Sequence, residues 1–261
     1  MKKVTCANVI LQSYIAVATA PPHAYMSAPK RARKDGIGGG GGGGGKIPTR
    51  VLGSSDLEVS VIALGCFAFG GDRKTGTHLG KAFTALHNGV WGEQDDKDTH
   101  ATVKAALDAG INFFDNAEMY GDGYAEEMMG DALTASGYDR SSYYVATKVS
   151  EAYLAPALVK EHLDASLKRM GMDYVDLYQL HWASRAALRT NKDPDRPLAQ
   201  EVPLEDTLAA LNECRLAGKI KHIGVCNFGV KDLRRALATG VPIVSNQICY
   251  NLLVSGMSSR L

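Results

Sequence analysis

Apolar runs of strand length alternate along this chain with stretches whose apolar residues recur at helical spacing. The apolar runs begin near residues 61, 113, 143, 176, 220 and 244. The helix-like stretches cover residues 97–109, 124–135, 156–170, 204–217 and 231–239. Strands that alternate singly with helices over short connections are typical of a parallel sheet. The pattern therefore predicts an α/β fold, preceded by a β-hairpin within residues 51–60.

Four of the apolar runs end in a polar side chain that can take part in chemistry. These side chains belong to Asp115, Lys148, His181 and Asn227. An open, doubly wound sheet would carry a GxGxxG phosphate-binding turn after a strand, and none follows these runs. A (β/α) barrel fits better, because the carboxyl ends of its strands share one rim, where active sites lie.

Tyr120 follows Asp115 by five residues and adds a possible acid to this rim. A phenol with a pKa of about 10 is a weak proton donor near neutral pH. A nearby ammonium lowers that pKa, and a carboxylate keeps the ammonium charged in a partly dry site. Tyr120, Lys148 and Asp115 could fill these roles when a carbonyl accepts a hydride, with His181 hydrogen-bonded to the carbonyl oxygen. Each residue alone is more often structural, but the four together favour catalysis.

Charge is distributed unevenly along the chain. Residues 1–34 contain six Lys and Arg residues and no acid, which leaves 23 basic against 28 acidic residues, a net charge of −5, in the rest. A mildly acidic body argues against nucleic acid as a partner.

No apolar stretch is long enough to span a bilayer. Five cysteines without paired spacing predict reduced thiols rather than a disulfide framework or a metal site, and no pattern indicates an oligomeric state.

Residues 1–45 differ in composition from the rest, and we expect them to form an extension outside a barrel domain of residues 46–261. Gly38–Gly45 is an unbroken glycine run, which is typical of a flexible linker. The basic, acid-free start is typical of an organellar transit peptide, plastid or mitochondrial. A secretory signal around Val9–Val17 and an uncleaved disordered tail on a cytoplasmic protein are the alternatives.

Several segments together resemble the aldo-keto reductase superfamily. They are DNAEMYG (115–121), VATK (145–148), DLYQLHW (176–182), AGKIKHIGVCNF (217–228) and NQICYNL (246–252). The opening RVLGSSDLEVSVIALG (50–65) resembles the N-terminal hairpin and first strand of that family. The resemblance extends from about residue 49 to residue 253, and it is nearest to the branch that holds Tas-like oxidoreductases and potassium-channel β subunits.

The resemblance implies a (β/α)8 TIM barrel that uses NADPH to reduce aldehydes or ketones, which are small-molecule carbonyl substrates. It assigns the catalytic tetrad, with the tyrosine as proton donor, to Asp115, Tyr120, Lys148 and His181. It assigns the cofactor-binding positions to Cys226, Asn227, Gln247 and Asp115. Within that set, the two amides would hold the nicotinamide carboxamide.

Two residues depart from the pattern of the family. Cys226 stands where the family usually has a serine, and a thiol is a weaker hydrogen-bond donor than a hydroxyl. Asn116 stands where the family usually has a threonine or a serine, and we expect this change to be tolerated.

The carboxyl end departs from the family as well, because the chain stops shortly after Leu253. We therefore expect a C-terminally truncated barrel with about six of eight strand–helix units. An unclosed barrel leaves exposed edges, so we expect this chain alone to be poorly stable and to bind NADPH weakly. The alternatives to a carbonyl reductase are a catalytically weak regulatory or scaffold subunit, as channel β subunits are, and an inactive truncated form.

Overall fold

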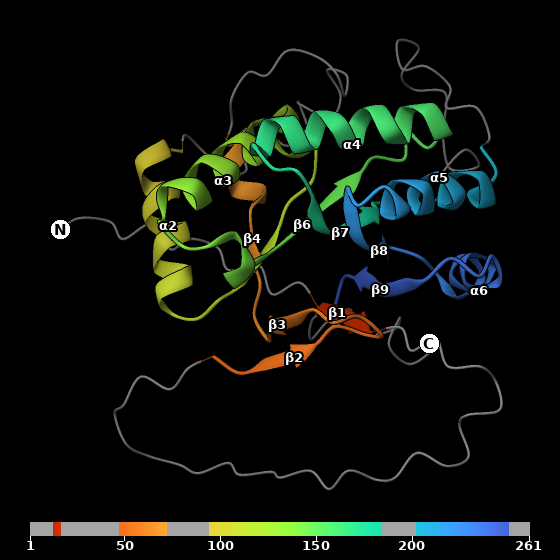
Figure 1. Ribbon diagram of the computed structural model, residues 1–261, viewed down its shortest axis with the longest axis horizontal. Helices are drawn as coiled ribbons and strands as arrows, with labels where there is room; N and C mark the ends of the chain where they lie inside the picture. Colours follow the sequence, from red (N-terminus) through yellow and green to blue (C-terminus); the bar gives the residue numbers. More distant parts are fainter. Residues whose placement is uncertain (1–12, 17–46, 72–93, 184–201, 251–261) are drawn as a thin grey trace, which may run out of the picture.

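The centre of the protein is a seven-stranded sheet in the order β1-β9-β8-β7-β6-β5-β4, in which β4 to β9 run parallel (Figure 1). The computed structural model describes residues 13–16, 47–71, 94–183 and 202–250. The strands are β1 (Ser13–Ala16), β2 (Thr49–Val51), β3 (Glu58–Ser60), β4 (Leu64–Gly65), β5 (Phe113–Asp115), β6 (Tyr144–Val149), β7 (Val175–Leu180), β8 (Ile220–Cys226) and β9 (Ile243–Ile248). The α-helices are α2 (Asp96–Asp108), α3 (Tyr124–Ala135), α4 (Pro156–Met170), α5 (Leu204–Leu216) and α6 (Val230–Ala238). Short 3-10 helices are η2 (Phe67–Gly70), η3 (Tyr120–Gly123) and η4 (Arg140–Ser142).

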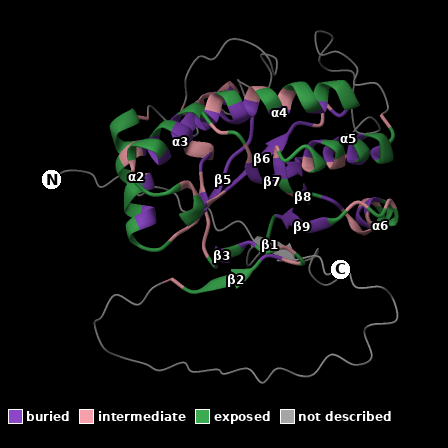
Figure 2. Cartoon of the chain, viewed as in Figure 1, coloured by how far each residue is buried: buried purple, intermediate pink, exposed green. Residues whose placement is uncertain are grey.

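The α-helices follow the parallel strands one by one and lie along the outer side of the sheet (Figure 1). Their buried sides face the strands and their exposed sides face solvent (Figure 2). Helix α4 shows how the sequence determines the two ends and the buried side of such a helix. Pro156 occupies its first turn, where a missing N–H costs nothing, and Gly171 ends it at φ +64°. Its buried apolar stripe consists of Val159, Leu163, Leu167 and Met170.

This architecture confirms the predicted parallel α/β fold, and the described residues form part of a (β/α)8 barrel. Each predicted helix is present, with ends that differ by one residue at most, and the predicted hairpin is the antiparallel pair β2–β3. The first parallel strand is shorter than expected. Only Leu64–Gly65 pairs with β5, because Val61 is exposed and its N–H donates to Pro48 instead.

The inside of the barrel has an apolar layer near the hairpin and a polar layer beyond it. The hairpin packs there against Phe113 of β5, Ala146 of β6 and Leu177 of β7. Side chains along a strand alternate between its two faces, so residues two positions further on face the same interior. On these three strands the next inward residues are Asp115, Lys148 and Gln179. The strand pattern therefore places polar groups at the carboxyl end of the barrel.

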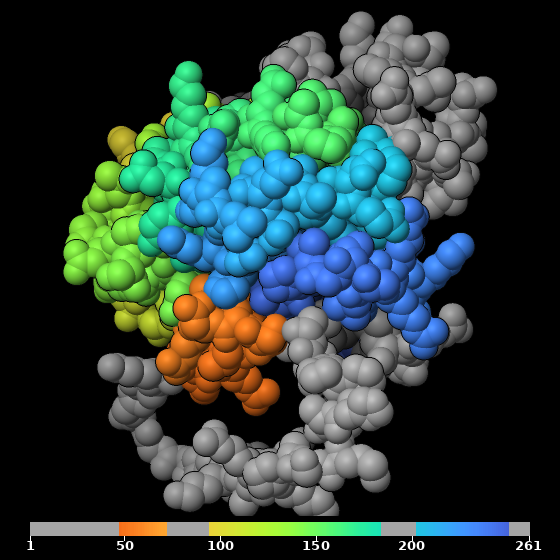
Figure 3. Space-filling model, turned by 45° about the vertical axis from the view of Figure 1, so that its right-hand side comes forward, coloured from red at the N-terminus to blue at the C-terminus, as the bar shows by residue number. Residues whose placement is uncertain are grey.

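The hairpin is fixed to the starts of two strands at the amino-terminal end of the barrel. In Figure 3 it lies, in orange, against the part of the chain coloured blue. There the Nε2 atom of His222 in β8 lies 2.6 Å from the Oδ1 atom of Asp56, and this hydrogen bond lowers the pKa of Asp56. The side chain of Asn112, just before β5, accepts from the N–H of Ser60 at 2.7 Å and donates to Glu58 O at 3.0 Å.

Strand β1 joins the sheet from a part of the chain that we expected to lie outside the barrel. It pairs antiparallel with β9, with Ser13 opposite Ile248 and Ala16 opposite Ser245. The edge of β9 away from β8 offers backbone N–H and C=O groups, and an added strand satisfies them. These four residues lie within the segment 1–45, and the division of the chain at residue 45 stays a prediction.

Several predictions concern residues outside the described part of the chain. They include the flexible linker at the glycine run 38–45, most of the targeting segment expected within residues 1–34, and the carboxyl end after residue 250. Within the described ranges, no helix is both long and apolar enough to cross a membrane. Those ranges also contain no group of three or more His, Cys, Asp or Glu side chains that could hold a metal ion.

Arg140 joins β6 to β7 near the starts of these strands. Its guanidinium donates to Asp176 Oδ2 at 2.6 Å and lies over the rings of Tyr143 and Tyr174. The same carboxylate oxygen accepts from the N–H of Val145 at 2.8 Å. Asp176 is buried, and these donors replace the water that its carboxylate has lost.

We expect Arg140→Ala to lower the free energy of unfolding by about 2–3 kcal/mol, because the nearly buried carboxylate of Asp176 loses its cation. Arg140→Lys keeps the charge but not the planar fork, and we expect an intermediate loss. Urea denaturation followed by circular dichroism measures both values. A loss below about 0.5 kcal/mol for Arg140→Ala, which is the range of ordinary surface changes, would contradict this role.

Candidate active site

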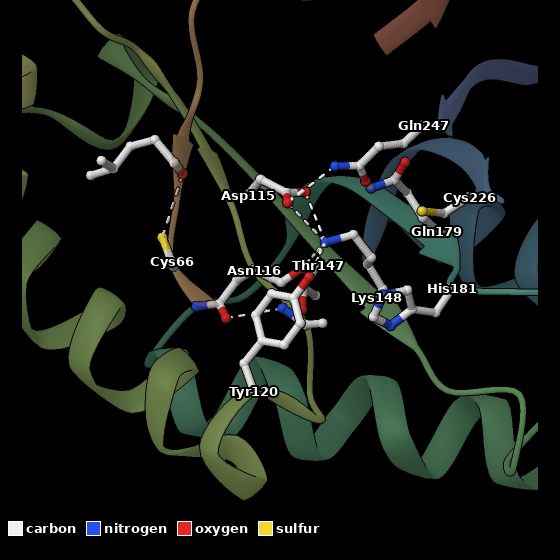
Figure 4. Close-up of polar contacts among 12 residues, drawn as sticks. Cys66, Asp115, Asn116, Tyr120, Thr147, Lys148, Gln179, His181, Cys226 and Gln247 are labelled. Atoms are coloured by element: carbon white, nitrogen blue, oxygen red, sulfur yellow. Dashed lines mark hydrogen bonds and ion pairs between the residues drawn. The ribbon is translucent and has the colours of Figure 1, made fainter. Parts of the chain in front are cut away.

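Four side chains from neighbouring strand exits meet at the carboxyl end of the barrel (Figure 4). Asp115 ends β5, Lys148 is the penultimate residue of β6, and His181 follows β7 directly. Tyr120 begins η3, in the connection after β5. The sequence predicted that these four residues share one rim, and the structure brings them together.

Lys148 and Asp115 form a buried ion pair between β6 and β5. The Nζ atom of Lys148 lies 2.9 Å from each carboxylate oxygen of Asp115 and donates to the backbone oxygen of Asn116 at 2.6 Å. Each of the paired side chains is only 1% exposed. Burial is the largest single influence and would lower the pKa of Lys148. The charge and hydrogen bond of Asp115, together with the neighbouring Tyr120 and Cys226, outweigh it, and that pKa lies above its usual value. The ammonium therefore keeps its charge inside the barrel.

Tyr120 is the third member of this group. Its hydroxyl oxygen lies 3.4 Å from the Nζ atom of Lys148, which donates to it. Its ring centroid lies 4.6 Å from that of Phe67 and 5.9 Å from that of His181, which meets it edge-on. The residue is 7% exposed. Two rings thus hold the phenol with its hydroxyl at the ammonium.

The net pKa shift of Tyr120 runs opposite to the one expected from the sequence. Burial raises the pKa of Tyr120 to about 12, and the Lys148 ammonium opposes this rise without overcoming it. The expectation of a lowered pKa is therefore wrong. Loss of water destabilises the phenolate more than a contact of 3.4 Å with the ammonium stabilises it. The phenol is consequently protonated near neutral pH, which is the form that can donate a proton.

His181 is fixed through its backbone and by ring stacking. Its N–H donates to Val149 O at 3.0 Å, and its backbone oxygen accepts from the Nδ2 atom of Asn227 at 2.9 Å. The imidazole stacks on the indole of Trp182 with ring centroids 3.8 Å apart. These contacts hold the imidazole at the edge of the Tyr120 ring, on the same rim as the ion pair.

The residues expected to hold a cofactor lie at the ends of β8 and β9. Cys226 is the last residue of β8, Asn227 follows it, and Gln247 is the penultimate residue of β9. Asn227 is exposed and has φ +59°, a left-handed conformation that asparagine adopts more readily than most residues. Its N–H donates to Gln247 O at 2.8 Å, and its side chain lies 3.2 Å from the Cys226 Sγ atom. Two amides and a thiol therefore stand beside the tetrad.

Asn116, which departs from the usual residue of the family, is buried with both ends of its amide bonded. Its Nδ2 atom donates to the backbone oxygen of Ala125 in α3 at 2.9 Å. Its Oδ1 atom accepts from the N–H of Ala117 at 2.9 Å. The larger side chain thus has partners here and links the loop after β5 to the start of α3.

Gln179 belongs to this site, although sequence reasoning gave it no role. It lies in β7 and is fully buried. Its Nε2 atom donates to Gln247 Oε1 at 3.1 Å, and Gln247 Nε2 donates to Asp115 Oδ2 at 3.2 Å (Figure 4). The sequence signal that could have identified Gln179 is a glutamine between the apolar residues Tyr178 and Leu180 of a buried strand. Buried polar residues are uncommon and need partners.

These features define a (β/α)8-barrel protein whose rim carries a buried Asp–Lys pair beside a protonated tyrosine and a histidine. Comparison with known sequences and structures places it more narrowly. The chain belongs to the aldo/keto reductase family, whose sequence model matches residues 84–260. Its placement in the Tas-like or channel β-subunit branch stays a prediction.

Several relatives are similar to this chain over much of its length. Aldo-keto reductase YhdN of Bacillus subtilis is 35% identical over 220 residues, which cover 80% of this chain and 56% of that protein. Methylglyoxal reductase YeaE of Escherichia coli is 33% identical over 183 residues, covering 68% and 58%. An aldo-keto reductase of Schizosaccharomyces pombe whose name specifies NADP(+) is 30% identical over 215 residues, covering 78% and 52%.

A solved structure agrees with the fold. The crystal structure of a thermostable aldo-keto reductase with the inhibitor epalrestat aligns with a TM-score of 0.64 at 29% sequence identity, covering 81% of this chain and 66% of that one. The chain spans little more than half the length of the curated relatives it matches.

Proposed function

We propose that this protein is an NADPH-dependent oxidoreductase that reduces aldehydes or ketones to alcohols, with Tyr120 as the proton donor. The observation that carries the proposal is the buried series of contacts from Asp115 through Lys148 to the hydroxyl of Tyr120. The names of two relatives, a methylglyoxal reductase and a reductase that specifies NADP(+), support a carbonyl substrate and this cofactor.

The residues at the ends of β8 and β9 fit the carboxamide of a nicotinamide. The side-chain amides of Asn227 and Gln247 can each donate and accept a hydrogen bond, which matches the donor and the acceptor of a carboxamide. Asp115 lies next to them, since it accepts from Gln247. When bound there, NADPH supplies the hydride.

Asp115, Tyr120, Lys148 and His181 would together supply the proton that the carbonyl oxygen requires. Tyr120 donates it to the carbonyl oxygen as that oxygen gains negative charge. Lys148 stabilises the phenolate that is left, because Asp115 keeps the ammonium charged. His181 donates a hydrogen bond to the same oxygen and orients the carbonyl.

Absorbance of NADPH, followed with a panel of aldehydes and ketones that includes methylglyoxal, tests this proposal. We expect oxidation of NADPH that depends on the carbonyl. A titration of NADPH fluorescence, extended to millimolar concentrations, tests the cofactor separately. Binding without turnover across the panel would contradict catalysis and favour a regulatory subunit. Absence of binding would contradict the choice of cofactor.

We expect Cys226→Ser to strengthen NADPH binding by about threefold to tenfold, because a hydroxyl donates a stronger hydrogen bond than a thiol. Burial raises the pKa of Cys226 to about 12, against the opposing charge of Lys148, so the native side chain is a neutral thiol. Fluorescence titration measures the affinity. Cys214→Ser, in α5, is the control and should leave it unchanged. Equal or weaker binding by Cys226→Ser would contradict this expectation.

A further inference from the structure

Gln179 lies in a row of inward-facing positions that crosses four neighbouring strands. In the register of the sheet, Lys148 stands beside Gln179, Gln179 beside Gly224, and Gly224 beside Ser245. The first of these residues belongs to the tetrad. The row therefore crosses the barrel from the tetrad residue on β6, through Gln179 and Gly224, to β9.

Gly224 leaves room for the two polar side chains on either side of it. A Cβ atom at this position would lie 2.6 Å from the Oγ atom of Ser245 and 3.2 Å from the Oε1 atom of Gln179. Contacts that close would force at least one of these side chains to move. The glycine therefore allows Gln179 to keep the conformation in which its amide reaches Gln247.

The amide of Gln179 is used on one side only. Its Nε2 atom donates to Gln247, whereas its buried Oε1 atom has no hydrogen-bond partner among the described residues. The same holds for the buried Oγ atom of Ser245. A buried acceptor without a partner destabilises the folded state, so an apolar side chain of similar shape would serve the fold at least as well. What a glutamine provides at this position, and an apolar residue would not, is the hydrogen bond from its Nε2 atom to Gln247.

We infer that Gln179 is a positioning residue, which holds the amide of Gln247 so that its nitrogen faces Asp115. The Oε1 atom of Gln247 receives the hydrogen bond from Gln179, and this leaves the Nε2 atom for Asp115 Oδ2. The carboxylate then has donors from Gln247 and from Lys148, which fix its position. This inference rests on the proposed function, because it concerns the carboxylate that keeps Lys148 charged beside Tyr120.

Loss of the Gln179 donor would free the amide of Gln247 to rotate. An amide that turned its oxygen toward Asp115 would place two acceptors against each other, which is unfavourable. The carboxylate would then be held mainly by Lys148, and the ammonium could move with it relative to the hydroxyl of Tyr120. A misplacement of about 1 Å in a catalytic group can cost about a hundredfold in rate.

Gln179→Met tests the inference, with Ser245→Ala as the matched control from the same row. We expect Gln179→Met to lower kcat for carbonyl reduction by about tenfold, with the KM of the carbonyl unchanged because Gln179 is fully buried and its hydrogen bond goes to Gln247. The thermal midpoint should stay near that of the wild type, since the variant removes an acceptor without a partner but also the hydrogen bond to Gln247 Oε1. Ser245→Ala removes only an atom without a partner, so it should keep the kinetics of the wild type with an equal or higher midpoint.

Side-chain amide exchange gives a readout that needs neither cofactor nor turnover. The chain has five glutamines, so isotope-labelled glutamine gives few amide signals in heteronuclear NMR. Gln247→Met identifies the signal of Gln247 by its disappearance. We expect the amide protons of Gln247 to exchange slowly with solvent in the wild type and faster in Gln179→Met. Where that variant folds poorly, Gln179→Leu, which is also apolar and without the donor, replaces it with the same expectation.

A double-variant cycle separates positioning from general damage. If Gln179 acts through Gln247, adding Gln179→Met to Gln247→Met should cause no further loss of kcat. Three results would each overturn this inference and leave the proposed function standing. They are kcat losses of Gln179→Met and Gln247→Met that add fully in the double variant, an unchanged kcat in Gln179→Met, and an equal loss of kcat in Ser245→Ala. A wild-type protein that neither binds NADPH nor reduces carbonyls would overturn the proposed function, and this inference with it.

Discussion

Tyr120→Phe is expected to lower kcat for carbonyl reduction by about 10²- to 10⁴-fold, which is the range of general-acid contributions. The substitution removes the hydroxyl that accepts from Lys148 and keeps the ring that packs on Phe67 and His181. Affinity for NADPH should change by about twofold at most, because an interaction made only in the transition state affects the chemical step. Steady-state kinetics and NADPH fluorescence titration measure these quantities.

Tyr124→Phe provides the matched control for this substitution. Its hydroxyl donates to Asp96 at 2.8 Å in an exposed contact between α3 and α2. We expect kinetics like those of the wild type. Unchanged turnover in Tyr120→Phe would remove Tyr120 from the proposed mechanism, and a parallel loss in Tyr124→Phe would show that the assay reports on packing rather than on proton donation.

Lys148→Met is expected to lower the free energy of unfolding by about 3–5 kcal/mol and to abolish turnover. The carboxylate of Asp115 is 1% exposed and would lose the ammonium that pairs with both of its oxygens. Leaving a buried charge without its counter-charge costs more than the pair itself contributes, because the carboxylate has already lost its water. Urea unfolding and the carbonyl assay measure the two effects.

The double variant Asp115→Asn/Lys148→Met tests the cause of that instability. Removing both charges leaves no unpaired ion in the barrel, so we expect it to regain part of the lost stability but no activity. A loss below about 1 kcal/mol in Lys148→Met, which is the size of an average substitution, would contradict a buried ion pair. A double variant less stable than the single one would contradict it as well.

Periodicity predicts most of the fold, because burial imposes it locally. A parallel strand covered on both faces needs a mostly apolar run, and in 175–180 four of the six residues are apolar and every residue is buried. A helix on the outer side needs one apolar stripe and signals at its ends, which Pro156 and Gly171 supply for α4. The common rim of Asp115, Lys148 and His181 follows from topology, because parallel strands end on the same side.

Pairing between distant segments could not be predicted in the same way. Strand β1 depends on a backbone edge that β9 offers more than two hundred residues further along the chain. The contact between Gln247 and Asp115 joins residues 132 positions apart, and Gln179 enters the site only through it. A local pattern carries no information about which distant groups come within hydrogen-bond distance.

The sequence by itself determined the order of strands and helices and the residues that stand at the carboxyl rim, because alternation and burial are properties of each segment. Only the tertiary structure decided how those residues act on one another. It showed that burial outweighs the ammonium at Tyr120 and that Gln179 reaches Asp115 through Gln247. Desolvation and hydrogen bonding depend on distances and on lost water, and both are fixed only when the strands are packed side by side.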